Sequence, residues 1–162
     1  MSDFEQSYLG RLRKLIGNRL VLMPGARCVI ERDDGRVLLQ LRGDMKVWGL
    51  PAGFCEADES VLTTLIREVA EETGLTILDP IPWGHASDPA TNTLTYPNGD
   101  RIQGFGLEFV ARRWDGALTA DGEETLELDW FALDDLPEML PAHRVTLEYF
   151  ERYRETGQFQ LF

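Results

Sequence analysis

The stretch from Gly53 to Leu75, GFCEADESVLTTLIREVAEETGL, constrains the fold more than any other part of this sequence. From about Ser60 to Thr73 it predicts an amphipathic helix, because apolar residues recur at helical intervals and form a stripe that we expect to face a core. The residues of this stripe are Leu62, Leu65, Ile66 and Val69. Asp58 or Ser60 can cap the start of the helix, and Gly74 provides the left-handed residue that commonly ends one.

Three glutamates, Glu68, Glu71 and Glu72, stand on this helix at i, i+3 and i+4, so their carboxylates lie on one face. Like charges at this spacing disfavour a helix by about 0.2–0.5 kcal/mol per pair, and a bound divalent cation reverses that effect. Hard oxygen ligands select Mg²⁺, Mn²⁺ or Ca²⁺. The alternative for an isolated run of charges is the solvated face of a surface helix. A calcium loop of the EF-hand type is disfavoured, because its alternating Asp and Asn ligands are missing.

The spacing of the polar residues and glycines in this stretch resembles the signature of the Nudix hydrolases and agrees with it at every defining position. Those positions are Gly53, Glu59, Arg67, Glu68, Val69, Glu71, Glu72, Gly74 and Leu75. The pattern of strands and helices alone indicates an α+β protein. The resemblance makes this specific: it implies the Nudix fold, a mixed β-sheet between helices, with the signature as loop, helix and loop. It extends over roughly residues 20–147.

The resemblance implies a Mg²⁺-dependent enzyme that cuts the diphosphate of a nucleoside diphosphate linked to another group. Mn²⁺ is an alternative metal. Glu71 and Glu72 are then the primary metal ligands, Glu68 is a further ligand or the general base, and Arg67 holds the glutamates in place. The implied catalytic residues are Glu68, Arg67 and Glu72, and the structural residues of the signature are Gly53, Glu59 and Gly74.

Two further metal ligands are implied outside the predicted helix. Ala52 precedes the signature glycine in the segment WGLPAG, where the family offers a backbone carbonyl to the metal and a second glycine is commoner. Many Nudix proteins also bring in a glutamate from shortly before a Trp-Phe strand. Glu124 and Glu127 precede Trp130-Phe131 here, and both stay candidates.

Four residues are candidates for substrate contacts: Arg42, Trp48, Tyr96 and Phe105. The arginine could meet a phosphate, and the aromatic rings could stack on a base. A plain surface arginine and packing within the fold are the alternatives. ADP-ribose and nucleotide sugars are favoured as substrates, because the sequence tags of the coenzyme A and NADH branches are absent. Nucleoside triphosphates, diadenosine polyphosphates and a non-catalytic nucleotide-binding regulator are the other readings.

Composition limits the partners and the compartment. The length of 162 residues suits one domain over 1–162, and the net charge of −12 argues against a protein that grips nucleic acid through its phosphates. No apolar run reaches the length of a membrane span, and the N-terminus is too acidic and polar for a signal peptide. We therefore expect a cytoplasmic protein with a small-molecule nucleotide partner and no membrane partner. A homodimer is left open.

Local patterns predict the remaining elements. We expect a helix over 3–16 within an N-terminal segment 1–17, hairpins over 26–42 and 93–113, strands over 75–83 and 123–131, and a helix over 142–156. Loops are predicted over 85–91 and 114–122. Cys28 is expected in the core and Cys55 in an exposed loop, whereas His85 and His143 are expected at the surface.

Overall fold

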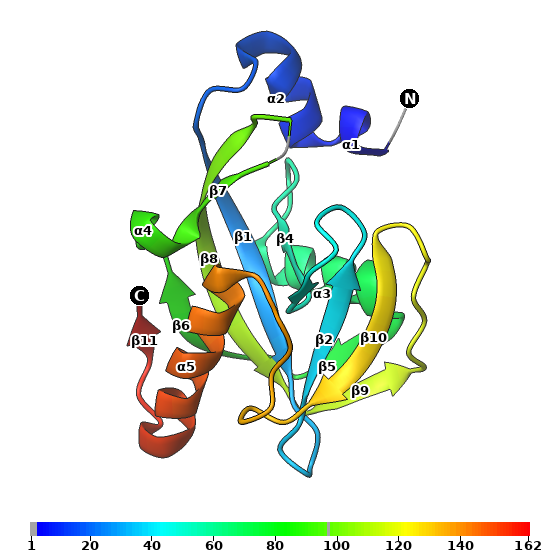
Figure 1. Cartoon of the computed structure of the whole chain (residues 1–162), viewed down its shortest axis with the longest axis vertical. Helices are drawn as coiled ribbons and strands as arrows, with labels where there is room; N and C mark the ends of the chain where they lie inside the picture. The colour runs from blue at the N-terminus through cyan, green and yellow to red at the C-terminus, as the bar shows by residue number, and fades with distance from the viewer. Residues whose placement is uncertain (1–2, 97) are drawn as a thin grey trace.

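Figure 1 shows the computed structural model of the chain, which describes residues 3–96 and 98–162, with side chains from residue 5 onward. The helices are α1 (Asp3–Gln6), α2 (Tyr8–Ile16), α3 (Val61–Thr73), α4 (Pro89–Asn92) and α5 (Pro141–Thr156). The strands are β1 (Val21–Ile30), β2 (Val37–Arg42), β3 (Trp48–Gly49), β4 (Ala52–Phe54), β5 (Leu75–Leu78), β6 (Ile81–Ala86), β7 (Thr93–Thr95), β8 (Arg101–Ala111), β9 (Arg113–Gly116), β10 (Thr125–Phe131) and β11 (Gln160–Leu161). In the described part of the chain, no helix has the length and apolar character needed to cross a bilayer.

The strands form one large mixed sheet and two small ones. The large sheet has the order β11-β6-β8-β1-β4, with β7 added beside β8. Its central pair, β1 and β8, is parallel, and so is the edge pair of β6 and β11, whereas β4 is antiparallel to β1 and β6 is antiparallel to β8. The small sheets are β10-β2-β3 and β5-β9. This mixture of parallel and antiparallel strands with helices confirms the predicted α+β class.

The large sheet lies between α3 and α5, behind and in front of it in Figure 1. Successive residues of β1 serve the two faces, because side chains alternate along a strand. Cys28 and Ile30 join a buried cluster with residues of α3, whereas Val29 joins a second cluster with residues of α5. The expected core position of Cys28 is confirmed. Each face of the sheet therefore has its own apolar core, and α3 is fixed on one of them.

Helix α3 begins and ends where its caps require. The Ser60 hydroxyl accepts a hydrogen bond from the Thr63 N–H at 3.1 Å, so Ser60 and not Asp58 caps the start. Gly74 has φ +74° and donates its N–H to the carbonyl of Ala70, which ends the helix.

The buried face of α3 differs from the predicted stripe. Leu65 and Val69 are buried, but Leu62 and Ile66 are 46% and 38% exposed. Glu72 is buried in their place, because the helix turns its glutamate side toward β4 and the strands beside it.

Several local predictions were corrected by long-range pairing. The hairpin expected over 26–42 is reduced to one bridge, Glu31 to Val37, because β1 pairs with β8 and β4 while β2 pairs with β10 and β3. The predicted loops over 85–91 and 114–122 contain the end of β6, most of α4 and most of β9. The N-terminal helix is divided at Ser7, and Cys55 is buried. The β7–β8 hairpin is confirmed, although Pro97 of its turn lies outside the described residues.

Candidate active site

Glu68 and Gly53 come into direct proximity where β4 passes α3. A Cβ added to Gly53 would lie 1.9 Å from Cδ of Glu68 and 2.0 Å from its Oε1. Any side chain at residue 53 would therefore occupy the space that the Glu68 carboxylate fills. The Glu68 carboxylate needs the space beside residue 53, which explains why residue 53 is a glycine.

Glu72 is the most buried of the three glutamates, with 8% exposure. Its Oε2 accepts a hydrogen bond from the Ala52 N–H at 2.9 Å. Burial raises the pKa of Glu72 to about 8, although the amide of Gln40 and the charge of Arg42 oppose this rise. The carboxylate form is thus costly in this position unless a cation approaches it.

Arg67 links the glutamates of the helix to the preceding loop. Its Nε and Nη2 contact the two carboxylate oxygens of Glu59 at 2.7 and 2.9 Å, and its Nη1 lies 2.8 Å from Glu68 Oε1 and 3.0 Å from Glu71 Oε2. The guanidinium lowers the pKa of Glu59 to about 2, mainly through these hydrogen bonds. The bidentate contact with Glu59 fixes the guanidinium plane and hence the orientation of Arg67 toward the helix.

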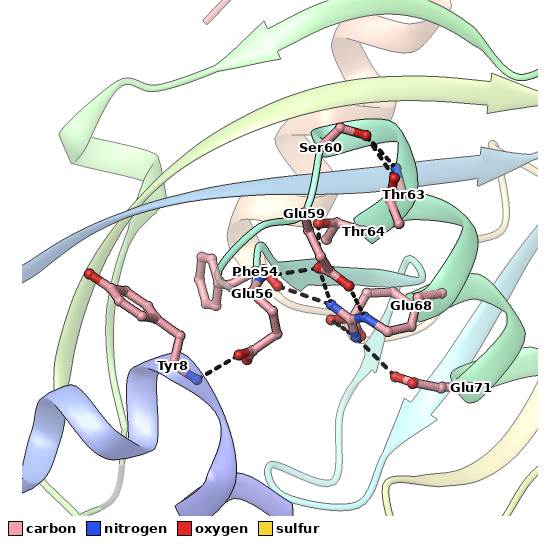
Figure 2. Close-up of polar contacts among 10 residues, drawn as sticks. Tyr8, Phe54, Glu56, Glu59, Ser60, Thr63, Thr64, Glu68 and Glu71 are labelled. Carbon is pink, nitrogen blue, oxygen red and sulfur yellow. Dashed lines mark hydrogen bonds and ion pairs between the residues drawn. The ribbon is translucent and has the colours of Figure 1, made fainter.

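The same network reaches the N-terminal helix, as Figure 2 shows. Glu59 Oε2 also accepts hydrogen bonds from the Thr64 hydroxyl at 2.8 Å and the Glu56 N–H at 3.0 Å. The Glu56 carboxylate in turn accepts the N–H of Tyr8, at the start of α2, at 2.6 Å. The loop between β4 and α3 is therefore held both by the helix that follows it and by α2.

The donor set suits a hard divalent cation, although the glutamates are engaged in other contacts. Within the described residues, no group of three Asp, Glu, His or Cys side chains is already arranged to hold a metal ion. Glu68 and Glu71 form ion pairs with Arg67 instead. Burial also raises the pKa of Glu68, as it does that of Glu72. A dication beside Glu68, Glu71 and Glu72 would favour their charged forms and offset that desolvation. The residues present therefore fit a site for a hard divalent cation.

Both glutamates proposed from outside the signature, Glu124 and Glu127, are exposed. The charge of Glu124 contributes to raising the pKa of Glu68, so Glu124 lies within electrostatic reach of that carboxylate. Glu127 lies on β10, where it pairs in register with Leu41. Which of the two is the additional ligand stays a prediction. Ala52 lies in β4 beside Glu72, and the role of its carbonyl stays a prediction.

A cavity of about 390 Å³ adjoins the signature loop at Ala52 and Gly53. Arg42 and Tyr96, two of the four predicted substrate residues, line it, and Arg42 also contacts Asp44 at 2.8 Å.

The other two predicted substrate residues do not line this cavity. Trp48 packs edge-on against Phe131, with ring centroids 4.9 Å apart. Phe105 alternates with Gly104 and Gly106, which line the cavity, and so occupies the opposite face of β8. Neither aromatic ring is thus placed to stack on a group in the cavity.

Sequence reasoning missed two polar residues that line this cavity, Arg27 and His143, and the buried partner of the arginine, Glu108. Arg27 and Glu108 form an ion pair between the central strands, and a single charge inside an apolar strand was the signal that could have identified each. His143 is buried, contrary to the expected surface position, because its Nδ1 accepts the N–H of Leu50 at 2.9 Å. Desolvation places the pKa of His143 well below its usual value, so its imidazole is neutral.

Comparison with known proteins agrees with this fold. Residues 21–151 match the model of the NUDIX domain, and the chain belongs to this family. It is 47% identical over 112 residues to the MutT-like protein of Streptomyces ambofaciens (69% of this chain, 65% of that protein). It is 29% identical over 146 residues to the ADP-ribose pyrophosphatase of Methanocaldococcus jannaschii (88% of this chain, 82% of that protein).

Two further comparisons are with a relative whose name gives no substrate and with a protein of solved structure. The uncharacterized Nudix hydrolase YvcI of Bacillus subtilis is 33% identical over 111 residues (67% of this chain, 65% of that protein). The chain thus spans slightly less than two thirds of YvcI and of the Streptomyces relative. The crystal structure of the MutT NUDIX hydrolase from Burkholderia pseudomallei superposes with a TM-score of 0.64 and 28% identity, over 79% of this chain and 97% of that one. The predicted family and fold are confirmed.

Proposed function

We propose that this protein is a Mg²⁺-dependent pyrophosphohydrolase that cleaves the diphosphate of a nucleoside diphosphate linked to another group. The observation that carries the proposal is the pair of Glu68, partly buried, and Glu72, buried, on α3 beside Gly53 and Ala52, which line the cavity, in a family of hydrolases. When bound, the divalent cation neutralises charge on the phosphoryl oxygens and lowers the pKa of water. Mn²⁺ is the alternative metal.

We assign each residue of the site a separate role. Glu71 and Glu72 are the primary ligands, with the Ala52 carbonyl and either Glu124 or Glu127 as further ligands. Glu68 is a ligand or accepts the proton of the attacking water, and its raised pKa brings it nearer to the working pH of a general base. Arg67 orients Glu68 and Glu71 through its contacts at 2.8 and 3.0 Å.

ADP-ribose and nucleotide sugars are the proposed substrates. The relative named ADP-ribose pyrophosphatase supports this choice, since its match extends over 88% of this chain and 82% of that protein. Nucleoside triphosphates and diadenosine polyphosphates are the alternatives, as is a regulator that binds a nucleotide without cleaving it. The complete set of signature glutamates favours an enzyme over that regulator. A cytoplasmic location, a single domain over 1–162 and the homodimer stay predictions.

A phosphatase-coupled phosphate assay over a panel of nucleotides tests the proposal. Glu71→Gln and Glu72→Gln should each lower Mg²⁺-dependent turnover by about a hundredfold or more, because each removes a charge that holds the metal. Glu151→Gln, at an exposed position of α5, is the matched control and should leave turnover unchanged. Near-normal turnover in both site variants would refute the assigned site, and wild-type protein that binds nucleotides without hydrolysing any would favour the regulator.

A further inference from the structure

Two glycines form the floor of the cavity beside the glutamate cluster. Gly104 and Gly106 of β8 line it, and a Cβ added to Gly104 would meet nothing closer than 3.7 Å. The walls come from α4, β7 and the start of α5, and Ala52 and Gly53 connect the cavity to the signature loop. A volume of about 390 Å³ is at the small end for ligand sites and suits a sugar-sized group rather than a whole dinucleotide.

An ion pair between the two central strands adjoins this cavity, and its arginine lines it. Arg27 and Glu108 are partners in the parallel register of β1 and β8, with Nη1 3.0 Å from Oε1. The same Nη1 donates to the hydroxyl of Thr146 on α5. The side chains of Arg27 and Glu108 are 12% and 0% exposed. Glu108 and Thr146 thus hold the arginine from two sides while it lines the cavity.

The pair is incompletely satisfied. Arg27 Nε and Glu108 Oε2 are buried without a hydrogen-bond partner among the described residues. The desolvation of two buried charges can exceed their mutual attraction, and unsatisfied buried polar atoms add to the cost. A contribution to folding stability therefore explains the presence of Arg27 poorly. A ligand that accepts a hydrogen bond from its guanidinium would explain it directly.

His143 adds a second donor to the same cavity. Its Nδ1 accepts the backbone N–H of Leu50 at 2.9 Å. Since the buried imidazole is neutral, its one proton is on Nε2, which is therefore a hydrogen-bond donor. His143 and Arg27 both line the cavity, so the group they recognise is rich in acceptor oxygens.

We propose that Arg27 is a specificity-determining residue, whose guanidinium donates a hydrogen bond to an oxygen of the sugar-like group joined to the diphosphate. Glu108 and Thr146 are the positioning residues that hold it, and the ring of the sugar lies over Gly104 and Gly106. This inference rests on the proposed function, because it assigns the two sides of a nucleoside diphosphate-linked substrate to different parts of the site.

Binding measurements test the inference without relying on turnover. We would measure the Kd of α,β-methylene ADP-ribose, which cannot be hydrolysed at the diphosphate, and the Kd of AMP, both by calorimetry with Mg²⁺. Because Arg27→Met alone leaves Glu108 buried and unpaired, the variant to use is the double substitution Arg27→Met with Glu108→Leu, which removes both charges. Thermal unfolding checks that it folds, and Gly104→Leu, which fills the cavity floor while leaving the ion pair in place, is the second variant.

We expect the double variant to bind the ADP-ribose analogue about ten- to a hundredfold more weakly, the loss expected for a hydrogen bond to a charged group. Gly104→Leu should weaken binding of the analogue comparably, because its side chain occupies the space of the sugar. Their affinity for AMP should stay within about twofold of wild type. Unchanged affinity for the analogue, or an equal loss for AMP, would overturn the inference. The proposed function is tested separately: wild-type protein that binds the analogue but hydrolyses no nucleotide would refute that function while leaving the role of Arg27 intact.

Discussion

Gly53→Ala should abolish most of the activity while leaving the fold intact. The added methyl would lie 1.9 Å from Cδ of Glu68, whereas ordinary van der Waals contact begins at 3.4 Å. The carboxyl group must therefore retreat by about 1.5 Å, which would also break its 2.8 Å contact with Arg67. The obstacle is the end of a flexible side chain, and the φ angle of Gly53 is not in the left-handed region, so the backbone can accept alanine.

The magnitude follows from the displacement. A misplacement of about 1 Å in a catalytic group can cost on the order of a hundredfold in rate, so we expect kcat to fall by at least that factor. The free energy of unfolding should change by less than about 1 kcal/mol, because no buried apolar contact is lost. The assay is Mg²⁺-dependent hydrolysis of ADP-ribose together with urea denaturation of the same preparations.

Gly84→Ala provides a matched control far from the signature. Its Cβ would meet the carbonyl of Gln160 and the ring of Phe162 at 3.3 Å, so it crowds the β6–β11 pair and should lower stability slightly without changing kcat. If Gly53→Ala retained wild-type kcat, the space above this glycine would not matter for catalysis and the role given to Glu68 would be refuted.

Three further predictions concern the signature. The pKa of Glu72 is about 8 in the folded protein, whereas its ordinary value is about 4.5. The folded state therefore holds the proton of Glu72 more tightly than the unfolded state does. The contribution of this proton to the free energy of unfolding is complete below about pH 4.5 and is lost as the pH rises through about 8. Glu72→Gln, which stays neutral, should therefore flatten the fall in Tm of the metal-free protein over that range, and an unchanged pH profile would contradict the burial argument. Arg67→Lys should lower kcat by about tenfold or more, because an ammonium cannot reproduce the bidentate contact with Glu59; wild-type kcat would show that this contact is dispensable. Gly74→Ala should cost about 1–2 kcal/mol in urea denaturation, since residue 74 has φ +74° and its Cβ would lie 2.8 Å from the carbonyl of Ala117, and an equally stable variant would contradict it.

The features that could be predicted from the sequence are those that local chemistry determines. Ser60 and Gly74 bound α3 because capping depends on neighbouring residues, and the fixed spacing of Arg67 and Glu68 after Glu59 brings these three together over two helical turns. The cavity residues could not be found in this way. Arg27 and Glu108 meet only because β1 and β8 are parallel neighbours, a pairing between residues 81 positions apart.

The wrong expectations have the same origin. The 26–42 segment has the turn of a hairpin, yet β2 pairs with β10 and leaves β1 to the large sheet. The apolar stripe predicted for α3 rests on periodicity alone. Periodicity cannot show that Gly53 lets β4 approach the glutamate side of the helix closely. This approach buries Glu72 and leaves Leu62 exposed. Local patterns thus identify the elements and the signature, whereas the partners of each element depend on the whole chain.

The central claim is that the glutamate face of α3 holds a divalent metal ion next to the cavity, and diffraction from crystals soaked in Mn²⁺ tests it most directly. Anomalous scattering should show a peak about 2 Å from carboxylate oxygens of Glu71 and Glu72, and the peak should vanish in the Glu72→Gln variant. A Mn²⁺ peak that lies elsewhere, with the ion pairs of Arg67 to Glu68 and Glu71 unchanged, would contradict the account.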